Sequence, residues 1–82
     1  MVDVDFESAF EESVKKTKDT LLKLRIKKQI DKIVENPEVG KPMRFGRKGT
    51  REVYISPFRL SYLYSKEENK IVFLDIYHKD EQ

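Results

Sequence analysis

The chain has 82 residues, 38% hydrophobic and 39% charged, and its 17 Lys and Arg against 15 Asp and Glu give a formal net charge of +2. This length fits one domain over residues 1–82, and no apolar run approaches the roughly 20 residues of a membrane span. With no cysteine and a single histidine, a disulfide scaffold, a thiol nucleophile and a Cys- or His-rich metal site are excluded, and we expect neither metal nor cofactor.

The beginning of the chain predicts a short strand and then a helix. Apolar residues alternate with aspartates over residues 2–6, and this period of two is typical of a strand. A helix over about residues 7–16 should follow. The spacing of Ser8 and Glu11 predicts a capping box at its start, with Asp5 as a competing N-cap.

A second helix is predicted up to Asn36-Pro37, because proline disfavours helix in the residue before it. Asp19 or Thr20 would cap its start. Its apolar residues recur every three or four positions, namely Leu22, Ile26, Ile30 and Ile33. Two helices joined by a tight turn should form an antiparallel hairpin.

The second half of the chain predicts three strands. Apolar and polar residues alternate over residues 52–56 and 58–65, and residues 71–77 form a nearly continuous apolar run. Being apolar on both faces except at Asp75, the last strand should lie inside the sheet, covered on one side by the helices. The expected fold is α+β: an N-terminal strand, an antiparallel two-helix hairpin and a three- to four-stranded antiparallel sheet.

The charges are unevenly distributed along the chain. Residues 1–12 carry five acids and no base, whereas residues 41–51 carry five bases and no acid. With Phe45 among its cations, the basic segment suits phosphates and unstacked bases. A solvated basic loop would have the same composition.

Arg59 has an unusual place in the predicted sheet. It alternates with Leu60, so the two side chains point to opposite faces of the strand. If Leu60 packs beneath the helices, Arg59 faces the open side, where an arginine among apolar neighbours needs a partner or a ligand. A salt bridge to Glu52 or Asp75 on a neighbouring strand is the purely structural alternative.

Several motifs after the helices carry a family resemblance. They are Lys41-Pro42-Met43-Arg44-Phe45, then GTREVYI over residues 49–55, then Phe58-Arg59-Leu60-Ser61-Tyr62, and finally an apolar strand followed by Tyr77-His78-Lys79. In these motifs, its length and its order of elements, the chain resembles the RelE/ParE superfamily of toxins. The resemblance implies a RelE-like fold, similar to that of small microbial ribonucleases.

The resemblance also implies a function. RelE-like toxins cut messenger RNA in the ribosomal A site without a metal, so the implied partners are a 70S-type ribosome, its mRNA and a RelB-like cognate antitoxin. No membrane is implied, and DNA is reached only through the antitoxin. No signal peptide opens the chain, so we expect a cytoplasmic protein. A ParE-like gyrase inhibitor and a non-catalytic RNA- or ribosome-binding module are the alternatives.

Cleavage of RNA by its own 2′-hydroxyl needs a base, an acid and cations that stabilise the charge on the phosphate. With a single histidine, a metal-free site here would rely on Arg, Lys and Tyr. The resemblance assigns Arg59 to the scissile phosphate and Lys79 to the acid or a phosphate contact. The predicted catalytic residues are Arg59, Lys79, Arg51, Tyr54 and His78, and the predicted RNA-binding residues are Lys41, Arg44, Arg47 and Lys48.

Two departures from the RelE pattern bear on activity. Active RelE toxins carry lysines where this chain has Glu52 and Tyr54, and a carboxylate there would repel phosphate. They also have a tyrosine several residues after the last basic position, and this sequence stops at Gln82 without one. Either Tyr54, Tyr62 or Tyr77 substitutes for the missing tyrosine, or the protein is a slow nuclease or one with a different target.

Overall fold

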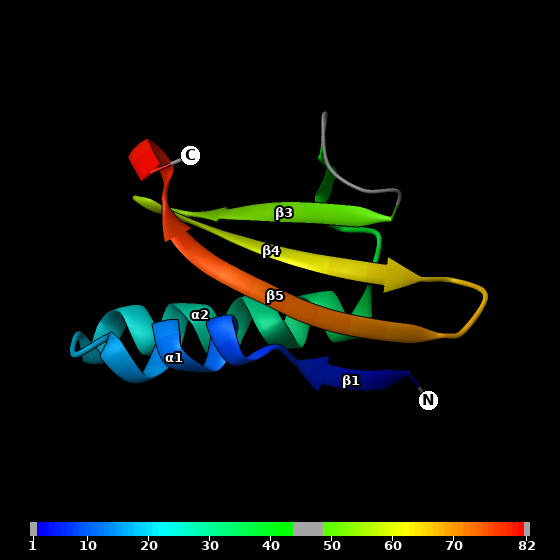
Figure 1. The fold of residues 1–82 in the computed structure, drawn as a ribbon, viewed down its shortest axis with the longest axis horizontal. Coiled ribbons are helices and arrows are strands. Elements are labelled where there is room, and N and C mark those ends of the chain that lie inside the picture. The colour runs from blue at the N-terminus through cyan, green and yellow to red at the C-terminus, as the bar shows by residue number, and fades with distance from the viewer. Residues whose placement is uncertain (1, 44–48, 82) are drawn as a thin grey trace.

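The structure is a computed structural model that describes residues 2–43 and 49–81. It confirms the predicted α+β order of a strand, two helices and then strands (Figure 1). In chain order its elements are β1 (Asp3–Phe6), α1 (Ser8–Lys16), α2 (Thr20–Glu35), β2 (Lys41–Pro42), β3 (Thr50–Ile55), β4 (Phe58–Ser65), β5 (Lys70–His78) and the 3-10 helix η1 (Lys79–Glu81).

The strands of the described residues form one sheet in the order β1-β5-β4-β3-β2. The predicted antiparallel pairing holds from β2 to β5. β1 instead pairs with β5 in parallel, so the sheet is mixed and has five strands. The sequence predicted β1 but did not indicate which strand it pairs with. β5 therefore has a paired strand on each side, as its apolar composition indicates.

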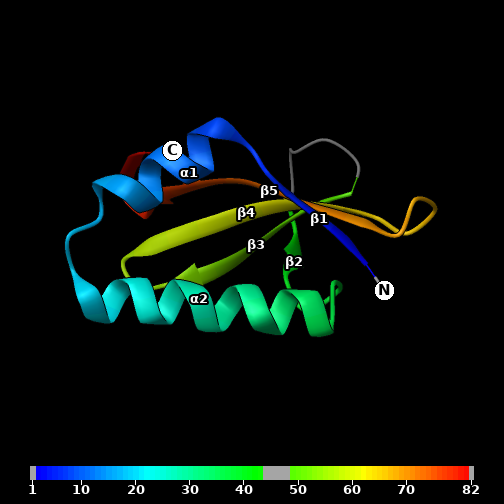
Figure 2. The same cartoon turned by 90° about the horizontal axis from the view of Figure 1, so that it is seen from below.

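Both helices cover the same face of the sheet (Figures 1 and 2). α2 begins as predicted, since Asp19 Oδ1 accepts hydrogen bonds from the backbone nitrogens of Leu21 and Leu22 at 3.0 and 3.2 Å. No helix in the described part of the chain is long and apolar enough to cross a membrane.

α1 begins within one residue of its predicted start, but its predicted capping is wrong. Its N-cap is Glu7, which makes no side-chain capping bond, and Ser8 is already helical. The Glu7 nitrogen donates to the Phe73 carbonyl at 2.9 Å, so the end of the β1–β5 pairing fixes where the helix begins. Asp5, the competing cap, lies in β1 and pairs with Lys70 at 3.0 Å.

The core lies between the helices and the inner face of the sheet. Ile33 of α2, Leu60 and Tyr62 of β4, and Phe73 of β5 are fully buried. Phe73 and Ile76 both face this core although they are three positions apart, because the β4–β5 register shifts at a bulge between them. The bulge explains why the sequence of β5 looks apolar on both faces.

Candidate functional site

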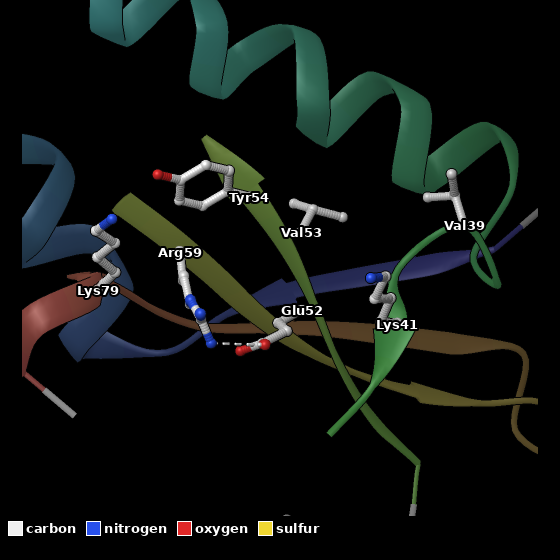
Figure 3. A pocket seen from close by; sticks show the side chains of 7 residues that line it. All are labelled: Val39, Lys41, Glu52, Val53, Tyr54, Arg59 and Lys79. Carbon is white, nitrogen blue, oxygen red and sulfur yellow. Dashed lines mark hydrogen bonds and ion pairs between the residues drawn. The ribbon is translucent and has the colours of Figure 1, made fainter. Parts of the chain in front are cut away.

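A pocket of about 510 Å³ opens on the sheet and is lined by β2, β3, β4 and the segments next to β2 and β5 (Figure 3). Its lining brings together four of the predicted site residues and adds a carboxylate and two apolar side chains. The lining residues are Val39, Lys41, Glu52, Val53, Tyr54, Arg59 and Lys79.

The strand register explains this grouping. Tyr54 lies opposite Arg59 across β3 and β4, and Arg59 lies opposite Tyr77 across β4 and β5. In the next row, Lys41 of β2 lies opposite Glu52 of β3. Paired positions send their side chains to the same face of a sheet, so residues far apart in the sequence meet here.

Glu52 lies at the centre of the site. Its Oε1 is 3.1 Å from Arg59 Nη1, and its Oε2 accepts a hydrogen bond from the Tyr77 hydroxyl at 3.1 Å. The salt bridge that the sequence offered as an alternative therefore forms, with Glu52. Asp75, the other possible partner, instead accepts a hydrogen bond from Ser13 Oγ of α1 at 3.0 Å.

The ion pair leaves Arg59 accessible. The Arg59 side chain is 35% exposed and that of Glu52 is 24% exposed, and both line the pocket. Partly exposed pairs of this kind stabilise a fold by only about 0.2–1 kcal/mol. An anionic ligand that engages the guanidinium through two hydrogen bonds can compete with such a contact.

Lys41 and Lys79 stand toward opposite ends of the pocket. Figure 3 shows Lys79 near Tyr54 at one end and Lys41 near Val39 at the other, with Arg59 and Glu52 between them. Tyr54 is 54% exposed, so its ring is open to stacking by an aromatic ligand. Cations beside an exposed aromatic ring suit the phosphates and bases of a single-stranded nucleic acid.

Other predicted site residues are placed elsewhere. Arg51 does not line the pocket, because its Nη1 donates to the carbonyl oxygens of Glu38 and Gly40 at 3.0 and 2.7 Å. His78 is also outside the lining, and its Nδ1 accepts from the Asp80 nitrogen at 3.2 Å. Three predicted RNA-binding residues lie outside the described residues: Arg44, Arg47 and Lys48.

Sequence reasoning undervalued Glu52 and Tyr77. Glu52 was expected to repel phosphate or to pair with Arg59 as a purely structural alternative, and Tyr77 was considered only as a substitute for a missing tyrosine. A signal for Glu52 exists, since the short turn between β3 and β4 places it diagonally across from Arg59. Tyr77 has no such signal, because its register depends on the bulge in β5.

The described part of the chain holds no group of three His, Asp or Glu side chains that could bind a metal ion. The site's charged groups are instead three cations around one carboxylate. Such a set can bind an anion, stabilise negative charge on it and accept a proton beside it.

Comparison with known proteins gives a family and a fold. A family model described as the ParE toxin of the type II toxin–antitoxin system, parDE, matches residues 4–82. No curated protein sequence matches the chain.

Solved structures with the same fold include toxins bound to their antitoxins. The intact E. coli RelBE toxin–antitoxin complex matches with a TM-score of 0.82 and 18% identity, over 95% of this chain and 96% of that chain. The RelBE2 complex of Mycobacterium tuberculosis matches with a TM-score of 0.74 and 25% identity, over 95% and 98%. The E. coli DinJ–YafQ complex has a TM-score of 0.81 and 15% identity, over 99% and 97%. Since the family model covers nearly every residue and the fold is that of RelE, the chain belongs to the ParE/RelE superfamily of type II toxin–antitoxin toxins.

Proposed function

We propose that this toxin is a metal-independent endoribonuclease that cleaves messenger RNA in the ribosomal A site. The observation that carries the proposal is the pocket that gathers Arg59, Lys41 and Lys79 around the carboxylate of Glu52. It supplies the three requirements of cleavage by a 2′-hydroxyl, namely positive charge for the phosphate, a carboxylate to accept a proton and Lys79 as an acid.

Glu52 is the proton acceptor in this proposal. An RNA phosphate seated on Arg59 would replace one of the contacts that now hold the carboxylate, since arginine binds phosphate through a planar fork of donors. The other contact, from the Tyr77 hydroxyl at 3.1 Å, would keep Glu52 oriented. The freed carboxylate oxygen would then take the 2′-hydroxyl proton.

The remaining pocket residues have roles that follow from their chemistry. Arg59 stabilises the charge on the phosphate oxygens, and Lys79 serves the leaving 5′-oxygen as an acid or a charge partner. Tyr54 stacks on a base. Lys41 binds a neighbouring phosphate, together with the predicted contacts at Arg44, Arg47 and Lys48. His78 stays a predicted proton carrier next to Lys79.

The proposal includes the partners of the reaction. A RelB-like antitoxin would neutralise the toxin, as supported by the relatives that crystallised with their antitoxins, and DNA would be reached only through it. Cleavage in the A site requires a 70S-type ribosome, and this places the protein in the cytoplasm.

A second candidate function is inhibition of DNA gyrase without cleavage of RNA. The family model that matches the chain describes ParE toxins, and the resemblance to ParE implies this target. In that case the pocket would do no chemistry, and Glu52 would serve only as the salt-bridge partner of Arg59.

One experiment separates these functions. A defined message is translated with purified ribosomes and the toxin, and breaks are mapped by primer extension. Breaks at the A-site codon that disappear with Arg59→Ala, but not with Lys28→Ala on α2, support the nuclease. An intact message overturns it. Loss of gyrase supercoiling would then support the second function, and cosedimentation with ribosomes alone would support a non-catalytic binding module.

A further inference from the structure

One wall of the pocket depends on a segment with little regular structure of its own. Val39 and Lys41 line the pocket, yet they lie between the end of α2 and the two-residue strand β2. A strand this short has few backbone hydrogen bonds to hold it in place. Two side chains of the sheet that do not line the pocket supply the missing contacts.

Tyr62 of β4 provides the first set of contacts. Its ring is fully buried, and its hydroxyl donates to the Pro37 carbonyl at 2.8 Å and accepts from the Gly40 nitrogen at 2.9 Å. One hydroxyl thus fastens the backbone on both sides of Val39. Because it is buried, the loss of either contact would leave an unpaired polar group in the interior.

Arg51 of β3 provides the second set of contacts. It lies directly opposite Tyr62 in the β3–β4 pair. Its Nη1 donates to the carbonyl oxygens of Glu38 and Gly40 at 3.0 and 2.7 Å. A Cβ at position 40 would lie 2.6 Å from the Tyr62 hydroxyl and 3.0 Å from the Glu52 carbonyl. Only glycine at position 40 therefore allows the backbone of the segment to approach the sheet this closely.

We propose that Tyr62 and Arg51 are positioning residues that hold Val39 and Lys41 in place as one wall of the RNA-binding pocket. The inference rests on the proposed function for its ligand, and it gives Arg51 a role that differs from direct contact with RNA. The two residues would act through Lys41, whose ammonium group needs a fixed backbone to stay aligned with Arg59 and Glu52.

Amide hydrogen exchange tests the positioning without any RNA. The Val39 nitrogen donates to the Asn36 carbonyl at 3.0 Å, a contact that Tyr62→Phe leaves chemically intact. We expect Tyr62→Phe to speed exchange at Val39 by about tenfold or more, because the segment opens locally. The Glu7 amide, bonded to Phe73 far along the chain, should change much less, and Tyr64→Phe is the matched control. Equal acceleration at Val39 and Glu7, or none at Val39, overturns the inference.

Binding of a labelled 2′-O-methyl hexaribonucleotide, which cannot be cleaved through its 2′-oxygen, tests the route through Lys41. Fluorescence anisotropy gives the Kd for Tyr62→Phe, Lys41→Ala and the double variant. Tyr62→Phe should weaken binding about fivefold in the wild-type background and less than about twofold with Lys41→Ala, because coupled residues are not additive. Arg51→Lys, which keeps the charge, should behave in the same way.

The outcomes separate the two proposals. If Tyr62→Phe or Arg51→Lys weakens binding by the same factor with and without Lys41→Ala, that residue acts independently of Lys41. This result would overturn the positioning role. Binding that is insensitive to both Lys41→Ala and Arg59→Ala would instead contradict the RNA site in the pocket. Exchange at Val39 would still decide whether Tyr62 fixes the segment.

Discussion

The role of a single residue here depends on what its neighbours in the sheet are. The sequence predicted that Arg59 faces away from the core, because alternation along a strand is a local property. It did not predict that Glu52 would be held from two sides, by Arg59 and by Tyr77. That arrangement needs the register of three strands, which local patterns do not specify.

Glu52→Gln tests the proton-accepting role. We expect cleavage of ribosome-bound message to fall by about 10²-fold or more, the usual effect of removing a positioned proton-transfer group. The Kd for the uncleavable oligonucleotide should stay level or decrease, because a negative charge leaves the pocket. Glu67→Gln, in the hairpin loop after β4, is the matched control. Parallel loss of cleavage and binding would assign Glu52 to scaffolding alone.

Tyr62 should make the fold sensitive to high pH. Burial raises the pKa of its hydroxyl above the ordinary value of 10.0, while its Gly40 hydrogen bond and the nearby Arg51 charge oppose the shift. The folded state thus binds this proton more tightly than the unfolded chain does. The stability that comes from this tighter proton binding by Tyr62 is fully present below about pH 10 and is lost as the pH rises through the raised pKa.

Tyr62→Phe gives the measurement. Near pH 8 the variant should be less stable by about 1–3 kcal/mol, since it leaves buried backbone groups unpaired. Urea unfolding should show that this difference in unfolding free energy between wild type and variant narrows as the pH rises above about 10. The reason is that only the wild type has the buried phenol to ionise. The pKa of Lys70 is also raised, by its hydrogen bond to Asp5, but Lys70 is present in both proteins. A constant gap up to pH 11, about one unit above the ordinary tyrosine pKa, would exclude a role for this ionisation.

At the scale of the element, predictions succeeded where the signal is local. Asp19 caps the start of α2 with its side chain and Pro37 disfavours helix beyond Asn36, so the bounds of α2 follow from the sequence. The N-cap of α1 was mispredicted, because the Glu7 backbone there is held by a contact to Phe73, far along the chain. The bulge in β5 likewise arises from pairing with β4, so the apolar run of residues 71–77 did not specify its position.

The packing of β4 beneath the helices leads to a stability prediction. Leu60 is fully buried, so Leu60→Ala should lower the free energy of unfolding by about 2–5 kcal/mol through lost burial and a cavity. Leu24 of α2 is 58% exposed, and Leu24→Ala should change the free energy of unfolding by only about 0.5 kcal/mol. Urea unfolding measures both. Similar losses for the two variants would contradict the observed burial.

At the scale of the molecule, the charge asymmetry of the sequence becomes an asymmetry across the sheet. β1, with Asp3 and Asp5, is one edge strand, and β2, with Lys41, is the other. The formal net charge of +2 therefore understates the field that a polyanion meets near the pocket. The sequence showed that acidic and basic residues occupy separate segments, but only the strand order places these segments at opposite edges of the sheet.

The salt dependence of RNA binding measures how many phosphates this field engages. If the pocket cations Lys41, Arg59 and Lys79 each neutralise one phosphate of a single strand, log Kd should rise with log salt with a slope of about 2. Affinity would then fall about 20-fold between 50 and 200 mM salt, with Lys79→Ala lowering the slope by about 0.7. A steeper slope that returns to about 2 when Arg44, Arg47 and Lys48 are replaced by alanine would assign further phosphates to that segment. A flat response would exclude phosphate binding by both groups, and the basic residues would then serve contacts with proteins.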